Sequence, residues 1–402
     1  MSRCGNAAPR YTSNGPARCT RVSESDETRS GKTISEWLHV RLPVKQLSYE
    51  HLCQKSVPLH KHSWAYNLGG LTLCAFLIQI ATGFLLMLYY QPTTAFAHES
   101  VHFITTVLPA GSLIRNLHVW SANAMVLLLF LHASTVALMR AYRKPREVTW
   151  LTGVLSMFVV LALAFSGYLL PWNTLAVYAT KVGTEILQVS TDFLFYPLSE
   201  AGTFAARLLV GSEGVGQQTL SRFYALHAFG LPLLLLTLAA AHLLLVQLHG
   251  VSIPLSLSKH KLADEPFFPE FAIKECGIWL VFAGFLVVLA VVLPYDSFIP
   301  YTLSAAFDPL APAPTGIKPE WYFYFLYYPL EMLPRAAAIS GSIIFFLALA
   351  ATPWLIVRLP RLWGQTFEQS KFPTAAVATV IGALVALTVW GENLVRAARG
   401  WH

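Results

Sequence analysis

The segment LHVWSANAMVLLLFLH, residues 117–132, joins an apolar run to a histidine near each end, and it decides the fold. A second segment, LHAFGLPLLLLTLAAAHL at 226–243, has the same character. Their histidines have matched spacing: His118 and His132 stand at positions i and i+14, and His227 and His242 at i and i+15. Because an interval of 14 is nearly four helical turns, the two histidines of one helix share a face, with a rise of about 21 Å between them.

Two such helices offer two histidines at each of two depths. We expect the helices to be antiparallel, with His118 paired with His227 near the outer side of a membrane and His132 with His242 near the inner side. Each pair could ligate one heme iron from both faces, which leaves no open position for oxygen and suits electron transfer. Histidines inside a membrane are rare and usually functional. The sequence therefore predicts two hemes b, with these four histidines as the metal ligands.

Small and basic residues support the pairing. Four glycines in neighbouring apolar segments repeat the 14-residue spacing: they are Gly69, Gly83, Gly153 and Gly167. Such residues often serve helix packing, but the match with the histidines favours close approach to the heme edges. Arg115 and Arg222, which precede the outer histidines, could pair with heme propionates. Snorkelling to the membrane interface is the alternative for each arginine.

The composition places the whole chain in a bilayer. Only 12% of its 402 residues are charged and the mean hydropathy is +0.52, whereas soluble domains carry about 25% charged residues. Seven apolar segments reach the roughly 20 residues that a spanning helix needs. They lie at about 68–90, 112–139, 148–170, 221–248, 272–294, 338–358 and 374–395. We therefore predict an all-α, polytopic bundle of seven transmembrane helices, with both hemes in a four-helix N-terminal bundle.

The charges predict the orientation. Most Lys and Arg residues lie before the first span or in the second, fourth and sixth connections, which places these parts and the N-terminus in the cytoplasm. The net charge of +7 does not indicate nucleic acid, because the basic residues flank apolar runs instead of forming a stripe. Residues 1–40 are polar and lack the apolar core of a signal peptide, so we expect a disordered or loosely docked tail.

Several motifs resemble the cytochrome b family, and together they extend over nearly the whole chain after the tail. They are WAYNLGG at 64–70, QIATG at 79–83, LIRNLH at 113–118, SGYLLPW at 166–172, SRFYALH at 221–227 and PEWY at 319–322. The 15-residue spacing and the three helices that follow resemble a plastid-type bf cytochrome b fused to its subunit IV. The resemblance implies a di-heme domain at 41–250 and a three-helix domain at 251–402, in a bacterial inner membrane.

The family resemblance also implies a reaction and partners. Quinol is oxidised at the outer face, where Glu320 of the PEWY motif is the candidate proton acceptor. Tyr168, Tyr322 and Tyr327 match positions around that pocket. One electron goes to a Rieske iron–sulfur protein and on to a c-type cytochrome, and the other crosses both hemes to an inner quinone. The complex is expected to be dimeric and embedded in lipid, with protons released outside.

Some positions depart from the family pattern. Asn67 stands where the bf branch has a cysteine that attaches an additional heme, so we expect no covalent heme. At the inner quinone site Gln247 and Glu275 replace the histidine and aspartate of the mitochondrial type, and His249 lies nearby as a substitute.

Two other functions fit parts of the pattern. A di-heme membrane anchor of a dehydrogenase or hydrogenase also needs four histidines, but it does not predict the PEWY motif or three more helices. A secondary transporter with a histidine proton relay predicts internal repeats and broken helices, which the sequence does not show.

Overall fold

The computed structural model describes residues 40–42, 55–188, 199–254, 257, 262–298, 304–312, 314, 317–358 and 372–398. The expected N-terminal tail lies outside the described residues, apart from Val40. All the helices and strands named below belong to one unit, residues 41–402.

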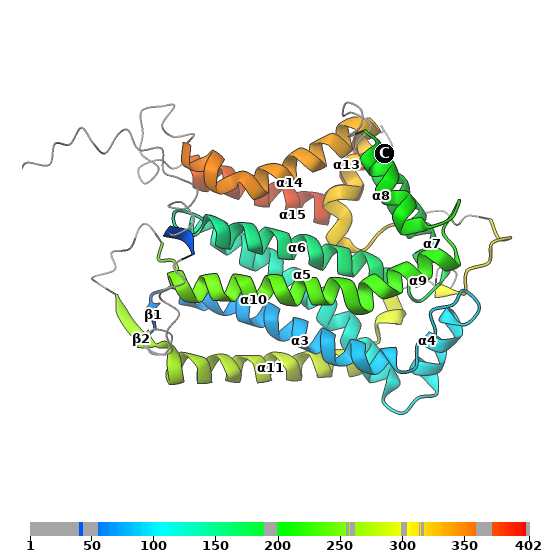
Figure 1. The fold of residues 1–402 in the computed structure, drawn as a ribbon, viewed down its shortest axis with the longest axis horizontal. Helices are drawn as coiled ribbons and strands as arrows, with labels where there is room; N and C mark the ends of the chain where they lie inside the picture. Colours follow the sequence, from blue (N-terminus) through cyan, green and yellow to red (C-terminus); the bar gives the residue numbers. More distant parts are fainter. Residues whose placement is uncertain are drawn as a thin grey trace, which may run out of the picture. The chain divides into compact units, whose positions relative to one another are not determined.

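Seven helices are long and apolar enough to cross a membrane, as predicted. They are α3 (Asn67–Met87), α5 (Gly111–Leu138), α6 (Glu147–Tyr168), α10 (Leu231–His249), α11 (Ala272–Val292), α14 (Arg335–Arg358) and α15 (Phe372–Ala398). The fourth span begins earlier than α10, since α9 (Gln217–Ala225) and the π-helical turn η3 (Leu226–Gly230) continue into it. Figure 1 shows the seven spans lying lengthwise beside one another.

Shorter elements gather at the two ends of the spans (Figure 1). One end carries the helices α4 (Ala97–Thr106), α7 (Thr174–Gln188), α8 (Glu200–Val210) and α13 (Tyr324–Met332). The first three are more amphipathic than the spans, which suits a membrane surface. Short helical turns complete the fold: η2 (Ser63–Tyr66), η5 (Phe267–Phe271), η6 (Tyr295–Phe298) and η7 (Trp321–Phe323).

The opposite end carries a feature that the all-α expectation left out. Strands β1 (Ser56–Leu59) and β2 (Ala263–Pro266) form an antiparallel pair, in which Ser56 faces Pro266 and Leu59 faces Ala263. The pair joins the segment before α3 to the segment before α11. The fold is otherwise helical, as predicted.

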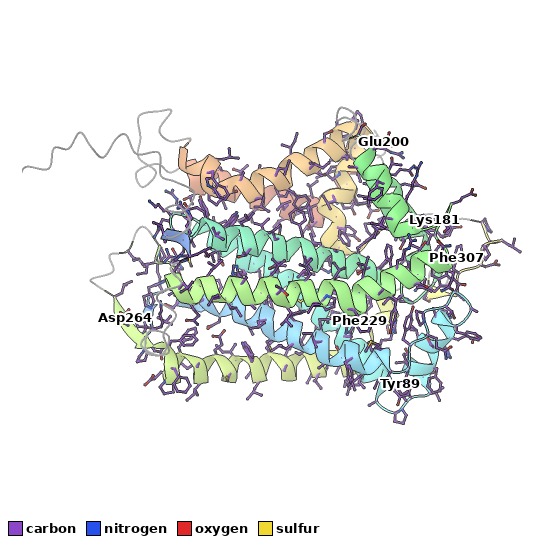
Figure 2. The ribbon with its side chains drawn as sticks, viewed as in Figure 1. Tyr89, Lys181, Glu200, Phe229, Asp264 and Phe307 are labelled. Atoms are coloured by element: carbon purple, nitrogen blue, oxygen red, sulfur yellow. The ribbon has the colours of Figure 1, made fainter. Side chains whose placement is uncertain are left out.

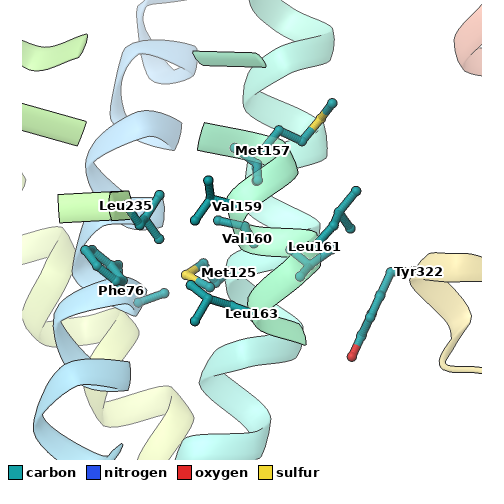
Figure 3. Close-up of a cluster of buried hydrophobic side chains, with 12 residues drawn as sticks. Phe76, Met125, Met157, Val159, Val160, Leu161, Leu163, Leu235 and Tyr322 are labelled. Atoms are coloured by element: carbon teal, nitrogen blue, oxygen red, sulfur yellow. The ribbon is translucent and has the colours of Figure 1, made fainter. Parts of the chain in front are cut away.

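The central packing connects α3 with α5 and α6 with α10. Met125, Val160 and Leu235 belong to a buried apolar cluster (Figure 3), and Met125 and Leu235 lie about midway between the histidines of their helices. Within a bilayer the hydrophobic effect does not drive helices together, because lipid tails are as apolar as leucine; dispersion contacts between close-packed side chains do so. The cluster therefore fills the space between the two histidine levels with tightly packed side chains.

The outer surfaces of the spans are apolar, which suits contact with lipid. On α11, Leu280 and Val281 are each 75% exposed. A soluble protein would bury such side chains, whereas a bilayer solvates them. The structure thus agrees with the transmembrane interpretation of the sequence.

Figure 2 labels Lys181 and Phe307 at the end of the spans that carries α4 and α7. The Nζ atom of Lys181 on α7 lies 5.3 Å from the ring centre of Phe307, in the connection before the PEWY motif. The backbone N–H of Phe307 also donates to the carbonyl of Trp172 at 3.2 Å. The connection that follows the third span and the one that follows the fifth are therefore held together beside the outer site.

Candidate functional site

The four histidines meet in the predicted pairs. The ring centres of His118 and His227 are 6.2 Å apart, and those of His132 and His242 are 6.4 Å apart. A metal–imidazole bond is about 2.0 Å long and a ring nitrogen lies about 1.1 Å from the ring centre, so two rings on one metal would have centres roughly 6.2 Å apart. Both pairs therefore have the separation that two imidazoles bound to one metal ion would have.

The direction of the two helices was predicted wrongly. In the structure the first histidine of α5 faces the first histidine of the fourth span, and the second faces the second, so the two helices run parallel. Successive spans of a membrane chain alternate in direction, and these are the second and the fourth. The expected pairing is correct because the helices are parallel; antiparallel helices would have paired His118 with His242.

The unequal spacing of the histidines has a local cause. His227 lies within η3, a π-helical turn, and α5 has no such turn between its histidines. A π-helical turn contains one more residue than an α-helical turn. The 15-residue interval of the fourth span therefore spans the same rotation about the helix axis as the 14-residue interval of α5. Pro232 favours this turn, because its ring crowds the carbonyl of Ala228 and it has no N–H to donate there.

Hydrogen bonds orient the rings by their Nδ1 atoms. The partners are Thr82 Oγ1 for His118 (2.8 Å), the Leu163 carbonyl for His227 (3.0 Å) and Thr152 Oγ1 for His242 (3.1 Å). Within the described residues the Nδ1 atom of His132 has no partner. Such bonds fix the tautomer and direct Nε2 toward a metal. Three of the four imidazoles thus have the outer-shell partner typical of a metal ligand.

The four glycines lie against the histidine rings. Each glycine leaves little room for a Cβ next to the Cε1 atom of one histidine. The separations would be 3.1 Å for Gly69 and His132, 3.3 Å for Gly83 and His118, 3.1 Å for Gly153 and His242, and 2.5 Å for Gly167 and His227. At Gly167 this separation is below any ordinary carbon contact, so a side chain there would displace the imidazole. The observed role is to make room for the ring, and approach to a heme edge stays a prediction.

The two arginines behave differently. Arg115 lies one turn before His118 on α5, as the propionate interpretation requires. Arg222 donates to the carbonyls of Arg207, at 3.3 Å, and Leu208, and so satisfies the C-terminal end of α8. An ion pair between either arginine and a heme propionate stays a prediction.

At the end of the spans that carries the PEWY motif, Glu320 is hydrogen-bonded to a residue that sequence reasoning missed. The hydroxyl of Tyr295 donates to Glu320 Oε2 at 2.7 Å, and Trp321 Nε1 donates to Asn123 Oδ1 on α5 at 2.8 Å. An asparagine in an apolar span is costly unless it is paired, so Asn123 was a usable signal. Tyr295 gave none, since tyrosine near a membrane interface is common.

Two of the predicted tyrosines, Tyr168 and Tyr322, interact electrostatically with the same carboxyl group. Burial raises the pKa of Glu320, and the hydrogen bond from Tyr295 offsets part of that rise. Burial raises the pKa of Tyr322 well above its usual value, and nearby Glu320, Tyr295 and Tyr168 raise it further. Tyr168 and Tyr322 thus lie within electrostatic range of Glu320, and their part in the reaction stays a prediction. Tyr327 packs its ring 5.3 Å from that of Tyr328 on α13, and its place in this group stays a prediction.

The two candidate ligands of the inner quinone lie on different helices. The carboxyl group of Glu275, in the first turn of α11, lies directly over Gly70, where a Cβ would fall 1.6 Å from its Oε1 atom. His249 ends α10, and its imidazole is close to the backbone of Arg41. Arg146 donates to the His249 carbonyl at 3.0 Å.

Comparison with known proteins covers most of the chain. A family model described as "Cytochrome b/b6/petB" matches residues 52–250, and "Cytochrome b(C-terminal)/b6/petD" matches 307–401. A "Cytochrome bc complex cytochrome b subunit" of Chlorobaculum thiosulfatiphilum is 38% identical over 354 residues, 88% of this chain and 78% of the relative.

Other relatives match part of the chain or the fold. A cytochrome b6 of Synechococcus sp. (strain RCC307) is 40% identical over 222 residues, 55% of this chain and 97% of the relative. A chain of a solved "Hyperthermophilic respiratory Complex III" superimposes with a TM-score of 0.67 at 24% identity, covering 92% of this chain and all of that one. At that identity the superposition shows the fold alone.

Proposed function

Because the chain belongs to the cytochrome b family, we propose that it is the quinol-oxidising subunit of a cytochrome bc-type complex that carries two hemes b. The two histidine pairs carry the proposal, since ring centres 6.2 and 6.4 Å apart suit two heme irons, each of which would be held by one pair. Bis-histidine hemes, when bound, take up and pass on single electrons and have no open position for oxygen.

The residues of the outer site suit proton removal from a quinol. Glu320 is the proposed general base, because a carboxylate with a raised pKa can take a proton from a quinol hydroxyl near neutral pH. Tyr322, buried and 7% exposed, keeps bulk water away from that carboxylate together with Tyr168. Oxidation of a quinol to a quinone releases two protons and two electrons. Both protons leave on the outer side, one of them by way of Glu320, and the two electrons leave by separate routes, one to an iron–sulfur partner and one inward.

The inner site is proposed for quinone reduction. Glu275 and His249 lie near the inner ends of α11 and α10 and could deliver protons to a quinone. Arg146 holds the backbone at His249, since its guanidinium also donates to the Gly250 carbonyl at 3.4 Å.

The same proposal implies a domain division, a membrane location and a set of partners for the chain. We infer a division into a di-heme domain at 41–250 and a C-terminal domain at 251–402, in a multi-pass protein of a bacterial inner membrane with a cytoplasmic N-terminus. The proposed partners are a Rieske protein, a c-type cytochrome subunit and a second copy of the complex. The C-terminal family match favours this function over the di-heme anchor, whose activity does not call for residues 307–401.

The test is quinol:acceptor activity of the purified complex carrying Glu320→Gln, which keeps the shape of the side chain and removes the base. Loss of a positioned general base typically slows a reaction by about 100- to 10,000-fold. We expect slower quinol oxidation with both hemes retained. Glu213→Gln, in another external connection and exposed, is the matched control and should change neither. Unchanged activity of E320Q at every pH would exclude Glu320 as the base.

A further inference from the structure

Glu320 and its neighbour Trp321 are each fastened to a part of the chain that is distant in sequence. The Tyr295 hydroxyl donates to Glu320 Oε2 at 2.7 Å, and Trp321 donates to Asn123 at 2.8 Å. Among the described residues, the second carboxylate oxygen of Glu320, Oε1, receives no hydrogen bond. One oxygen is therefore held while the other is left to accept a proton.

The position of Tyr295 does not depend on its hydroxyl alone, although that hydroxyl also forms a hydrogen bond with Asn123. Its backbone N–H donates to Asn116 Oδ1 at 3.2 Å, and Trp120 Nε1 donates to the Leu293 carbonyl at 2.8 Å. The rings of Trp120 and Tyr295 meet edge to face at 5.7 Å. These contacts place the tyrosine ring beside Glu320, so a phenylalanine would keep the same place without the donor.

All three anchoring residues lie on one stripe of α5. Asn116, Trp120 and Asn123 stand at positions i, i+4 and i+7, which puts them on a common helix face. His118 stands at i+2, a rotation of about 200° from Asn116, and therefore faces the opposite way. α5 thus presents its histidines on one face and the anchors of the outer loop on the other.

We propose that Tyr295 is a positioning residue for quinol oxidation, whose hydroxyl holds the Glu320 carboxylate so that Oε1 faces the quinol. This inference rests on the proposed function of Glu320. Donation to a carboxylate stabilises its ionised form, which is the form that accepts a proton. Burial raises the pKa of Tyr295, and the nearby Glu320 carboxylate raises it further, so the phenol stays protonated and remains a donor. Tyr295 undergoes no net proton change in this role.

The main test is the pH profile of quinol oxidation in the purified complex carrying Tyr295→Phe, expressed per heme b. Without the donor, the Glu320 carboxylate is harder to ionise. We expect the acidic limb of the profile to move to higher pH by about one to two units, the size of a lost hydrogen bond to a charged group. Tyr90→Phe is the matched control, because that hydroxyl donates to the Leu170 carbonyl at 2.8 Å and does not touch Glu320. The control should leave the limb in place.

A second variant keeps the shape of the side chain and should shift the acidic limb of the pH profile in the opposite direction. Site-specific 3-fluorotyrosine at position 295 makes the phenol a stronger donor, so the acidic limb should move to lower pH. This substitution also keeps the test open if Y295F does not retain its hemes.

The double variant Y295F/E320Q separates this inference from the proposed function. With the carboxylate absent, Y295F should cause no further shift of the acidic limb beyond that of E320Q. A Y295F profile identical to that of the unmodified complex, together with a changed E320Q profile, would overturn the role of Tyr295 alone. An E320Q profile identical to that of the unmodified complex would overturn the role of Glu320, and that of Tyr295 with it.

Discussion

Removing one residue from the π-turn should leave both hemes in place, whereas removing one from α5 should not. The first variant deletes Phe229, which is 57% exposed in η3 (Figure 2), in a Pro232→Ala background so that the turn can close as regular α-helix. The two histidines of the fourth span would then stand at i and i+14, as His118 and His132 already do. The rings should keep their present relative direction.

The comparison variant deletes Leu127, which is 48% exposed in α5 and lies between its two histidines. α5 has no π-turn to absorb the loss, so His132 rotates by about 100° and shifts by about 1.5 Å relative to His118. With side chains reaching about 5–6 Å from the helix axis, the ring moves by roughly 8–9 Å. That displacement is about four times a metal–imidazole bond of about 2 Å, so the pair with His242 cannot hold one iron.

The measurement is pyridine hemochrome content and the reduced-minus-oxidised spectrum per mole of membrane-inserted chain. We expect two hemes b in the Phe229 deletion and loss of at least the inner heme in the Leu127 deletion. P232A alone, with its register unchanged, is the control. Equal loss of heme from both deletions, with both chains inserted, would refute the explanation of the 15-residue spacing.

Other predictions follow from the same sites. Heme staining of a denaturing gel should show no band at the mass of this chain, because Asn67 offers no thiol; a stained band would contradict this. His118→Leu or His227→Leu should remove the outer heme spectrum first, and His132→Leu or His242→Leu the inner one; equal loss from all four would leave the pairing unsupported. Gly167→Ala should cost more outer heme than Gly83→Ala, since the added carbon meets its histidine at 2.5 Å and not 3.3 Å; the reverse order in heme content would be inconsistent with the packing. The raised pKa of Glu320 means that a growing fraction of its carboxyl groups is protonated as the pH falls, so quinol oxidation should slow, with a midpoint above the usual carboxyl pKa. A rate that does not change with pH in this region would argue against Glu320 as the base.

The spans and the histidine pairs could be predicted because their signals are local. Apolar length identifies a spanning helix, and the 14-residue period identifies a common face, without any knowledge of tertiary contacts. The alternation of spans also predicts that α10 and α5, which belong to the fourth and second spans, run parallel. The antiparallel expectation was therefore wrong on the sequence alone. The 15-residue interval already indicated an irregular turn in the fourth span. Pro232 explains that turn, because proline disrupts the regular α-helical hydrogen bonds before it.

Other features depend on contacts between distant segments. SVPL at 56–59 and ADEP at 263–266 show no clear strand alternation and pair only because the fold brings them together. The Tyr295–Glu320 bond joins two external segments, of which neither has a regular period. The 14-residue spacing singles out the four glycines, but only the structure shows that histidine rings lie against them.

The anchors on α5 also bear on how such a protein could be encoded. Asn116, Trp120 and Asn123 lie in the part matched by one family model, while Trp321 lies in the part matched by the other. On the inner side, Arg140 likewise donates to Thr374 Oγ1 at 2.8 Å. These contacts are noncovalent and lie near both ends of α5, so they do not require a continuous backbone between the two halves. We therefore expect that two separate polypeptides, divided after residue 250, would still find each other in the bilayer, and that fusion mainly fixes their stoichiometry at one to one.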